Sequence, residues 1–359
     1  MEWRNSLTDL LQVAYPLMQA PMLHIATPAM VAAVSNAGAL GSLPVGGQSP
    51  ERVRTLIREV KSHTAKPFAV NLFAHPHPGQ VDPAQGARMH RVLRLIGEGY
   101  QLEWEQPALE NLPIFLAQDQ IPVLLEEKVP VVSFTFGVLE PQVLDAFRKA
   151  GVVTMGTATC LDEALRLQEQ GVSAVIAQGT EAGGHRGAFL NPEAPPQIGL
   201  AALVRGIVRA VRVPVIAAGG IMDGAGLAAA FALGAQGVQL GSAFLRCPES
   251  AAPPAYKAAV ATSQDQSTVL TKAFTGRWGR AIRNEFTRQM APHEALVLPY
   301  PVQEVLTRAL REKVGPEDVA KVFPLWAGQA AYLARELPAS QIVAAVLQEA
   351  EAILWPDFQ

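Results

Sequence analysis

The chain has 359 residues, of which 49% are hydrophobic and 17% are charged, so it can bury a large core and lacks the composition of a disordered protein. Its 29 lysines and arginines stand against 32 aspartates and glutamates, which gives a formal net charge of −3. Without a basic cluster interleaved with aromatic residues, nucleic acid is excluded as an expected partner.

The first 21 residues carry charges and prolines where a secretory signal would be apolar, and no segment approaches about 18 uninterrupted apolar residues. We therefore expect a cytoplasmic protein without a membrane partner. Cys160 and Cys247 lie far apart and outside any metal-ligand spacing, which fits a reducing compartment and two small buried residues.

Short apolar runs alternate along the chain with stretches of helical period, such as residues 49–63, and several of these stretches end in glycine, such as residues 141–151 and 160–171. Strands that are buried on both faces and joined by crossover helices predict a parallel sheet. Eight such units predict an α/β fold, a closed (β/α)8 TIM barrel. The expected strands are residues 16–20, 39–43, 67–73, 129–137, 151–157, 173–179, 213–220 and 237–244.

A barrel of this kind needs about 250 residues, so roughly a hundred remain to be placed. They fall in two blocks that follow the third and the eighth strand, and both blocks therefore leave the C-terminal ends of strands. We expect them to form one small, mostly helical cap domain over that face. The expected division is barrel 1–73 and 121–247, cap 74–120 and 248–322, and C-terminal helices within 323–359, at 326–338 and 340–354, that return to the barrel wall.

Glycines follow the seventh and eighth strands, at Gly219, Gly220 and Gly241. They let backbone N–H groups approach an anion closely, at the loops where barrels hold phosphate. Asp223 and Ser242 are candidates to cap the helices that follow. Glycines in one loop would only indicate a tight turn, whereas glycines in two adjacent loops favour a phosphate site.

The chain contains neither a P-loop nor the glycine fingerprint of a Rossmann dinucleotide site, so the phosphate is expected to belong to a resident cofactor. Amide and hydroxyl side chains stand near other strand ends, and amides both donate and accept, which suits the pyrimidine edge of a flavin. These side chains are Gln19, Asn71, Ser133, Thr135 and Gln178.

Several stretches together resemble the nitronate monooxygenase family, formerly the 2-nitropropane dioxygenases, nearly along the whole chain and in order. They are QAPM (19–22), VNLF (70–73), EAGGHRG (181–187), the glycine turns after the last two strands, and GRWGRAIRNEF (276–286). The resemblance implies an FMN-dependent barrel that oxidises alkyl nitronates, and possibly neutral nitroalkanes, with O2 to a carbonyl compound and nitrite.

The resemblance, with the glycine turns, also implies a set of flavin contacts. The expected cofactor-binding residues are Ala20, Pro21, Met22, Asn71, Gln178, Gly183, Gly184, Gly219, Gly220, Gln239, Leu240, Gly241 and Ser242.

His185 stands among glycines in the loop after the sixth strand, and by resemblance it is the catalytic base. An imidazole with an unperturbed pKa near 6.5 is neutral often enough at physiological pH to take the acidic α-proton of a nitroalkane. An anionic nitronate has already lost that proton, so His185 should matter more for neutral nitroalkanes. The competing interpretation is a histidine held by hydrogen bonds in a tight loop.

Other candidates carry weaker signals. His24, Ser133 and Tyr300 are expected to line the substrate pocket, and Trp326 and Gln329 are further candidates. The arginines of the GRWGRAIRN stretch, Arg277, Arg280 and Arg283, are expected to brace the cap rather than to bind substrate. His75 and His77 lie in a proline-rich loop with no third ligand nearby, so we expect no metal.

Alternatives remain open at this stage. FMN-dependent enoyl-acyl-carrier-protein reductases share the AGGH loop and a C-terminal GQ like that of Gly328 and Gln329, and an NADH:quinone reductase is a further possibility. An inosine-monophosphate-type dehydrogenase is disfavoured because no cysteine stands in the loop after strand six. A flavin-binding protein without catalysis is the alternative from a different class. The physiological substrate and the oligomeric state stay undetermined.

Overall fold

The computed structural model describes residues 3–105, 107–109 and 112–356 of the chain. Eight parallel strands form a nearly closed sheet in the order β1-β9-β8-β6-β5-β4-β3-β2, and a bridge between Met18 and Leu40 joins the two outer strands. The predicted (β/α)8 barrel is therefore confirmed, with each expected run supplying one strand. The strands are β1 (Leu17–Gln19), β2 (Gly41–Pro44), β3 (Phe68–Phe73), β4 (Val131–Thr135), β5 (Val153–Ala158), β6 (Ala174–Gln178), β8 (Val215–Ala218) and β9 (Gly237–Leu240).

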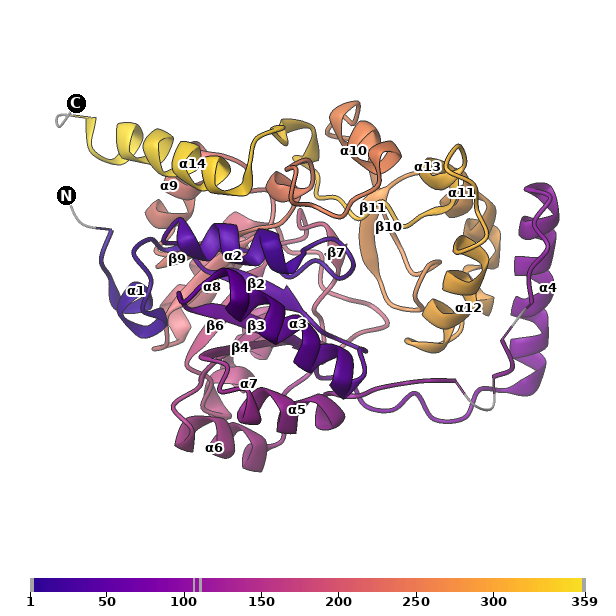
Figure 1. Ribbon diagram of the computed structural model, residues 1–359, viewed down its shortest axis with the longest axis horizontal. Helices are drawn as coiled ribbons and strands as arrows, with labels where there is room; N and C mark the ends of the chain where they lie inside the picture. The colour runs from indigo at the N-terminus through magenta and orange to yellow at the C-terminus, as the bar shows by residue number, and fades with distance from the viewer. Residues whose placement is uncertain (1–2, 106, 110–111, 357–359) are drawn as a thin grey trace.

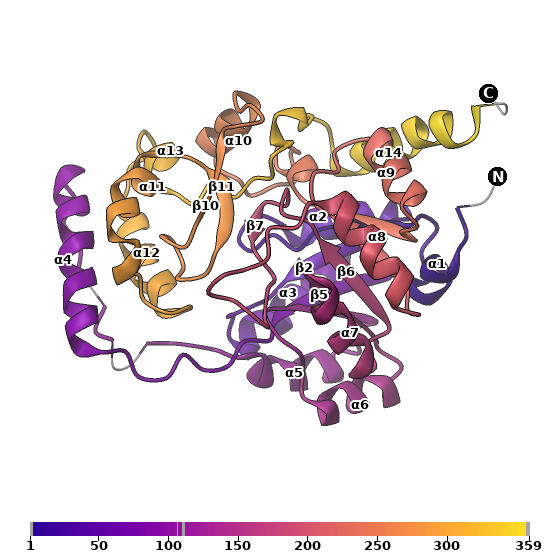
Figure 2. The same ribbon diagram turned by 180° about the vertical axis from the view of Figure 1, so that it is seen from behind.

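Helices follow the strands along the chain and cover the outside of the barrel (Figures 1 and 2). Many begin at a residue whose side chain or proline suits a helix N-terminus: Thr27 and Ser49 accept backbone N–H groups, and Pro28 and Pro50 follow them. The helices of the wall are α2 (Pro28–Asn36), α3 (Pro50–His63), α5 (Ala117–Glu126), α6 (Pro141–Lys149), α7 (Leu161–Glu169), α8 (Leu200–Ala210) and α9 (Gly224–Ala232).

The barrel has two apolar layers. One lies between strands and helices, where Val70, Val132 and Val175 are fully buried. The other fills the inside of the barrel, where Met155 and Ile216 pack with Leu7 and Leu11 of α1 (Ser6–Leu11). The first helix thus supplies apolar side chains to the barrel interior, and the opposite end of the strands is left for chemistry.

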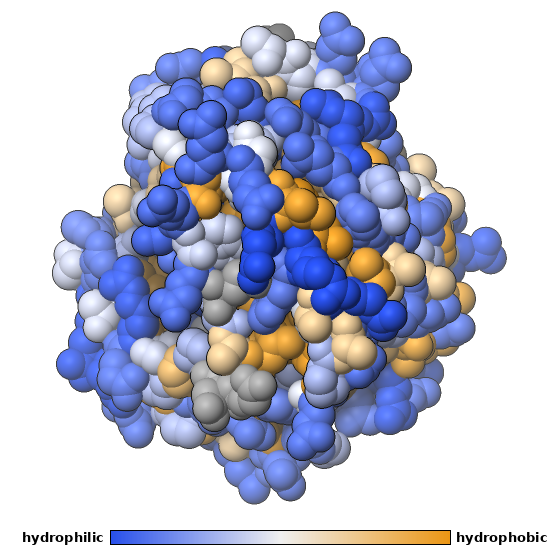
Figure 3. Space-filling model, turned by 90° about the vertical axis from the view of Figure 1, so that its right-hand side faces the viewer, coloured by the Kyte–Doolittle hydropathy of each residue, from blue (hydrophilic) through white to orange (hydrophobic). Residues whose placement is uncertain are grey.

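The cap lies beside the barrel and has an apolar core of its own, which includes Met89, Leu93, Phe274, Phe286 and Leu306 (Figure 1). Seen from the cap end, the outer surface is mostly hydrophilic with apolar patches between (Figure 3). Its helices are α4 (Pro83–Gly99), α10 (Pro254–Ala261), α11 (Glu285–Met290), η2 (Ala291–Leu296), α12 (Val302–Arg311) and α13 (Val319–Val322).

The cap also contains a sheet, which the expectation of a mostly helical cap missed. Strands β10 (Thr268–Thr271) and β11 (Gly279–Ile282) pair antiparallel, and β11 pairs on its other edge with β7 (Gly184–His185). Because β7 belongs to the loop after the sixth barrel strand, this three-stranded sheet joins cap and barrel.

The C-terminal part differs from expectation in one respect. Residues 326–338 were expected to be helical, but they contain only the short 3-10 helix η3 (Ala331–Leu333), because loop contacts hold this segment against the site. Helix α14 (Ala339–Leu354) does return to the barrel, where it packs against α2 and α9. None of the described helices is both long and apolar enough to cross a membrane.

We propose the division of the chain into barrel and cap that the sequence indicated, with one adjustment. Helix α5 belongs with the barrel although it begins at Ala117, because it packs against α3 and β3.

The role of Asp223 in holding the loop after β8, the seventh barrel strand along the chain, can be tested by substitution. Its Oδ1 accepts the N–H of Gly226 at 2.9 Å and caps α9. We predict that Asp223→Ala lowers the free energy of unfolding by about 0.5–2 kcal/mol, whereas Asp223→Asn, which retains an acceptor, lowers it much less. Urea unfolding followed by circular dichroism measures both, and equal losses in the two variants would contradict the capping role.

Candidate active site

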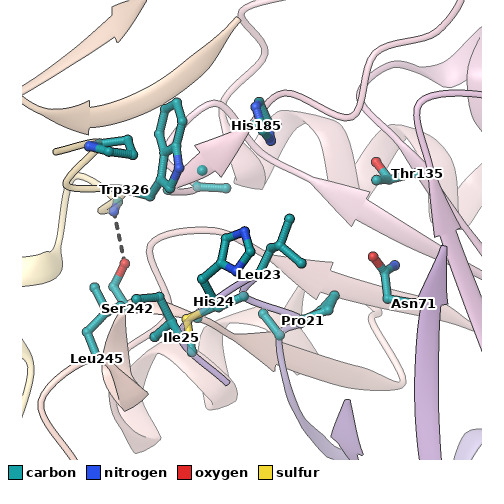
Figure 4. Close-up of a pocket in the computed structure, with 18 of the residues that line it drawn as sticks. Pro21, Leu23, His24, Ile25, Asn71, Thr135, His185, Ser242, Leu245 and Trp326 are labelled. Atoms are coloured by element: carbon teal, nitrogen blue, oxygen red, sulfur yellow. Dashed lines mark hydrogen bonds between the residues drawn. The ribbon is translucent and has the colours of Figure 1, made fainter. Parts of the chain in front are cut away.

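A cavity of about 540 Å³ opens at the C-terminal ends of the barrel strands, beneath the cap. That volume lies in the range of pockets that enclose a small molecule or cofactor. Figure 4 shows His185 and Trp326 on one side of the cavity, Asn71 and Thr135 on another, and His24 projecting between them. The sequence-predicted residues that line it are Ala20, Pro21, Met22, His24, Asn71, Gln178, Gly183, Gly184, His185, Gly219, Gly220, Gln239, Gly241, Ser242 and Tyr300.

His185 owes its position to backbone pairing across the joint between barrel and cap. It lies opposite Gly279 of β11, and the next residue, Arg186, donates its N–H to Trp278 O at 2.8 Å. Gly184 has φ +74°, a conformation that favours glycine, and so turns the chain into β7. The histidine is thus carried on a paired strand rather than on a free loop.

Gln178 at the end of β6 holds the same loop from the barrel side. Its Nε2 donates to His185 O at 2.9 Å, and its Oε1 accepts the N–H of Gly187 at 2.8 Å. The sequence interpretation assigned this amide to the flavin alone. The structure shows that both of its polar atoms also position the histidine loop.

Two buried charged residues complete the support of the loop. Arg186, 1% exposed, donates to the carbonyls of Gly179 and Pro196. Glu163, fully buried on α7, accepts the N–H groups of Phe189 and Leu190. Each charge meets several hydrogen-bond partners, which is the condition under which burial is tolerated.

Aromatic rings surround the imidazole. The ring centroids of Trp326, Phe136 and Tyr300 lie 5.0, 5.4 and 5.8 Å from that of His185. Phe136 has φ +77°, which is uncommon for a bulky residue and concentrates at functional sites. The rings make the reacting end of the cavity apolar and limit the access of water.

The surroundings keep the imidazole uncharged. Burial, followed by the positive charge of Arg277 and then by His75, lowers the pKa of His185 to about 3. Burial likewise lowers the pKa of His75, which is hydrogen-bonded to Pro76 O. His185 borders the cavity yet is enclosed by protein, so it is a neutral histidine with its lone pair available at physiological pH.

The glycine loops leave backbone donors free. Gly219 and Gly220 have φ +122° and +71°, and Gly241 precedes the 3-10 helix η1 (Ser242–Phe244). Within the hydrogen bonds of the described residues, the N–H groups of these three glycines have no acceptor. Since all three line the cavity, they present unused donors to an anion.

Gln239 adds an unpaired acceptor. Its Oε1 is buried and has no hydrogen-bond partner among the described residues, although the side chain lines the cavity. A native protein rarely leaves such a group unpaired, so the site is built for a ligand that carries both a donor and an anion.

Several predicted residues are placed elsewhere. The side chain of Leu240 packs in the core between strands and helices, because it alternates with Gln239. Ser133 lies deeper in the barrel than Thr135 and holds Asn71 Nδ2 through its Oγ at 3.0 Å, rather than lining the cavity.

Two more expectations need correction. Ser242 does not cap the helix after β9; its Oγ accepts the N–H of Gly328 at 2.9 Å and ties the C-terminal segment to the site (Figure 4). Gln329 lies outside the lining, and its backbone N–H donates to Glu181 O.

Two of the three arginines of the 276–286 stretch, Arg277 and Arg280, join the cap to loops of the barrel. Arg280 Nε donates to Thr180 O at 2.9 Å, and Arg277 Nη2 donates to Ala188 O. The guanidinium of Arg277 also lies 4.1 Å above the Phe136 ring. Sequence reasoning missed Phe136 and Thr275, since their role depends on how the cap meets the barrel.

The far side of the cavity is charged. His24, with φ +64°, faces Glu304, Arg308 and Arg311 of α12, and burial lowers its pKa. Tyr300 lines the cavity near His185, and burial raises the pKa of its hydroxyl, so it remains protonated. Among the described residues, no cluster of three or more metal-ligating side chains occurs.

Taken together, the barrel, the glycine loops and the enclosed histidine define a flavin-type barrel oxidoreductase. The nitronate monooxygenase family model matches residues 4–349. Probable nitronate monooxygenases of Staphylococcus saprophyticus and Staphylococcus aureus (strain Newman) are 38% and 37% identical to this chain, over 99% and 98% of both sequences. The chain belongs to the nitronate monooxygenase family, whose members are generally flavin-dependent oxidoreductases of nitronates or nitroalkanes.

Solved structures agree with this assignment. A nitroalkane oxidase from Streptomyces ansochromogenes has a TM-score of 0.85 at 37% identity, covering 96% of this chain and 98% of its own. FabK from Thermotoga maritima has a TM-score of 0.76 at 31% identity, covering 98% and 97%.

The charge state of His185 is open to direct measurement. A neutral histidine with a depressed pKa should show no titration in ¹⁵N-histidine NMR between about pH 5 and about pH 8, the interval in which an unperturbed imidazole changes charge. Its signal is assigned by its loss in His185→Gln. A titration midpoint near the ordinary 6.5 would contradict the burial argument.

Proposed function

We propose that the chain is an FMN-dependent nitronate monooxygenase that uses O2 to convert alkyl nitronates, and neutral nitroalkanes, to a carbonyl compound and nitrite. The observation that carries the proposal is a histidine held among the rings of Trp326, Phe136 and Tyr300 at one end of a cavity whose other end offers unused backbone donors. A small compound with an acidic C–H group suits the histidine end. A phosphate-bearing cofactor suits the end with the backbone donors.

The residues present fit FMN. Gly219, Gly220, Gly241 and Ser242 would hold the phosphate at the ends of β8 and β9. The bound flavin would supply the redox centre through which electrons pass from the substrate to O2.

The amides at other strand ends suit the flavin ring. Gln239 Oε1 would accept from a ring N–H, and Asn71 and Gln178 would present their remaining amide donors and acceptors. The family match and the open space beside Gly241, where a Cβ would meet only Ala20, support this placement.

His185 would act as the base on a neutral nitroalkane. Its lone pair takes the α-proton: the substrate C–H bond breaks, an N–H bond forms, and the electron pair stays on the substrate as a nitronate. A depressed pKa makes the free imidazole a weak base, but the nitronate formed beside it attracts the imidazolium, and Arg277 favours the anion as well. A preformed nitronate needs no such step.

The reductase alternative has weaker support. FabK from Thermotoga maritima has a lower TM-score and a lower identity to this chain than the nitroalkane oxidase, 0.76 against 0.85 and 31% against 37%. The solved enoyl reductase domain of MlnA is 13% identical to this chain with a TM-score of 0.65, a likeness that concerns the fold alone. The family model and the relatives of more than 35% identity favour the monooxygenase.

A substitution at Gly241 tests the proposed phosphate site of the cofactor. Its φ of −106° suits any residue, and a Cβ there has only one neighbour, Ala20 Cβ at 3.5 Å. We predict that Gly241→Val folds but places its methyl groups where the phosphate would lie, so the purified protein contains much less flavin than the wild type.

The matched control is Gly206→Val, since a Cβ at Gly206 in α8 meets nothing within 4 Å and lies outside the cavity. Absorption spectra of both variants and chromatography of the released cofactor measure the outcome. Full FMN content in Gly241→Val, or FAD in the wild type, would overturn the assignment.

His185→Asn tests the base. The amide cannot accept the proton, so activity on neutral nitroalkanes should fall by about 10²- to 10⁴-fold, whereas activity on the matching preformed nitronates should fall much less. Steady-state kinetics on such pairs at constant oxygen measure the difference. A histidine with a purely structural role would instead give equal losses on the two forms.

A further inference from the structure

Thr275 lies in the turn between β10 and β11 and lines the cavity beside the histidine. It is 2% exposed, and its Oγ1 lies 2.8 Å from His185 Nε2. The same hydroxyl contacts the backbone of Arg277: it lies 3.2 Å from Arg277 O and 3.3 Å from Arg277 N. The cap thus contributes a side chain that touches the imidazole directly.

A count of donors and acceptors fixes the direction of these bonds. A hydroxyl has one hydrogen to donate and two lone pairs with which to accept. The Arg277 carbonyl has no other donor among the described residues, and the Arg277 N–H requires an acceptor. When Thr275 donates to that carbonyl, its lone pairs accept from Arg277 N–H and from His185 Nε2–H, so each of these three groups has a partner and no N–H group of the ring is left unpaired.

The opposite arrangement leaves groups unpaired. If Thr275 donated to His185 Nε2, the Arg277 carbonyl would lose its donor and the proton would have to reside on Nδ1. His185 Nδ1 makes no hydrogen bond to any described residue. Unpaired polar groups in an enclosed site are costly, so the first arrangement is favoured.

We propose that Thr275 is a positioning residue that holds neutral His185 in the Nε2–H tautomer, so that the lone pair on Nδ1 receives the substrate proton. This inference rests on the proposed function of His185 as base. On proton transfer the substrate C–H bond breaks and an Nδ1–H bond forms, while the electron pair remains on the nitronate. The Nε2–H bond to Thr275 persists throughout, so the ring does not have to reorient.

Thr275→Val tests the inference, because valine keeps the shape of threonine and lacks the hydroxyl. We expect activity on neutral nitroalkanes to fall by roughly 10- to 100-fold, the size of effect that follows removal of a partner that orients a metal-ligating histidine, with little change on preformed nitronates. Thr275→Ser retains the hydroxyl and is the matched control, which should keep the wild-type ratio of the two activities. Equal losses on both substrate forms in Thr275→Val would overturn the inference.

Tautomer-sensitive ¹⁵N NMR gives a readout apart from activity. In the wild type, His185 should carry its proton on Nε2, and Thr275→Val should lose this preference; an Nδ1–H tautomer in the wild type would overturn the inference. The His185→Asn variant distinguishes an error in the assignment of the base from an error in the role of Thr275. If His185→Asn discriminates between substrate forms and Thr275→Val does not, only the role of Thr275 is wrong, whereas no discrimination by His185→Asn overturns the base and the inference together.

Discussion

The short antiparallel pairing of β7 with β11 is the contact on which the site depends. It brings His185, from a barrel loop, against Gly279 of the cap, and it sets the imidazole within reach of Thr275. Arg280 strengthens the same joint by donating to Thr180 O. The barrel alone would provide the glycine loops and the contacts of Gln178 with the histidine loop, but it would lack the strand partner and the hydroxyl that the cap brings to His185.

The pairing of β7 with β11 also accounts for the electrostatic environment of His185. By closing over the histidine, the cap brings Tyr300 and Arg277 close to its ring, the C-terminal segment adds Trp326, and burial lowers the pKa of the imidazole. A neutral imidazole and a nearby guanidinium together favour the conversion of an uncharged substrate into an anion. The opposite end of the cavity presents the free N–H groups of the glycine loops, so the two ends differ in chemistry.

Much of the barrel was predictable, because each strand is an apolar run whose burial follows from its own residues. The glycine turns were found because they follow two adjacent apolar runs, and His185 was found through its glycine-rich loop and the resemblance to the nitronate monooxygenases. Strands β10 and β11 were missed because their residues, such as Arg280 and Thr271, carry little apolar signal and their pairing depends on a segment about a hundred positions away. Thr275 could not be found from sequence, since only the folded cap brings it to the histidine.

The most direct test of the account is anaerobic mixing of the purified protein with a preformed nitronate while the flavin absorbance is followed. The account predicts that the nitronate alone bleaches the flavin, with nitrite and the carbonyl product appearing once O2 is admitted. Bleaching by NADH together with no response to the nitronate would contradict it and would favour a reductase.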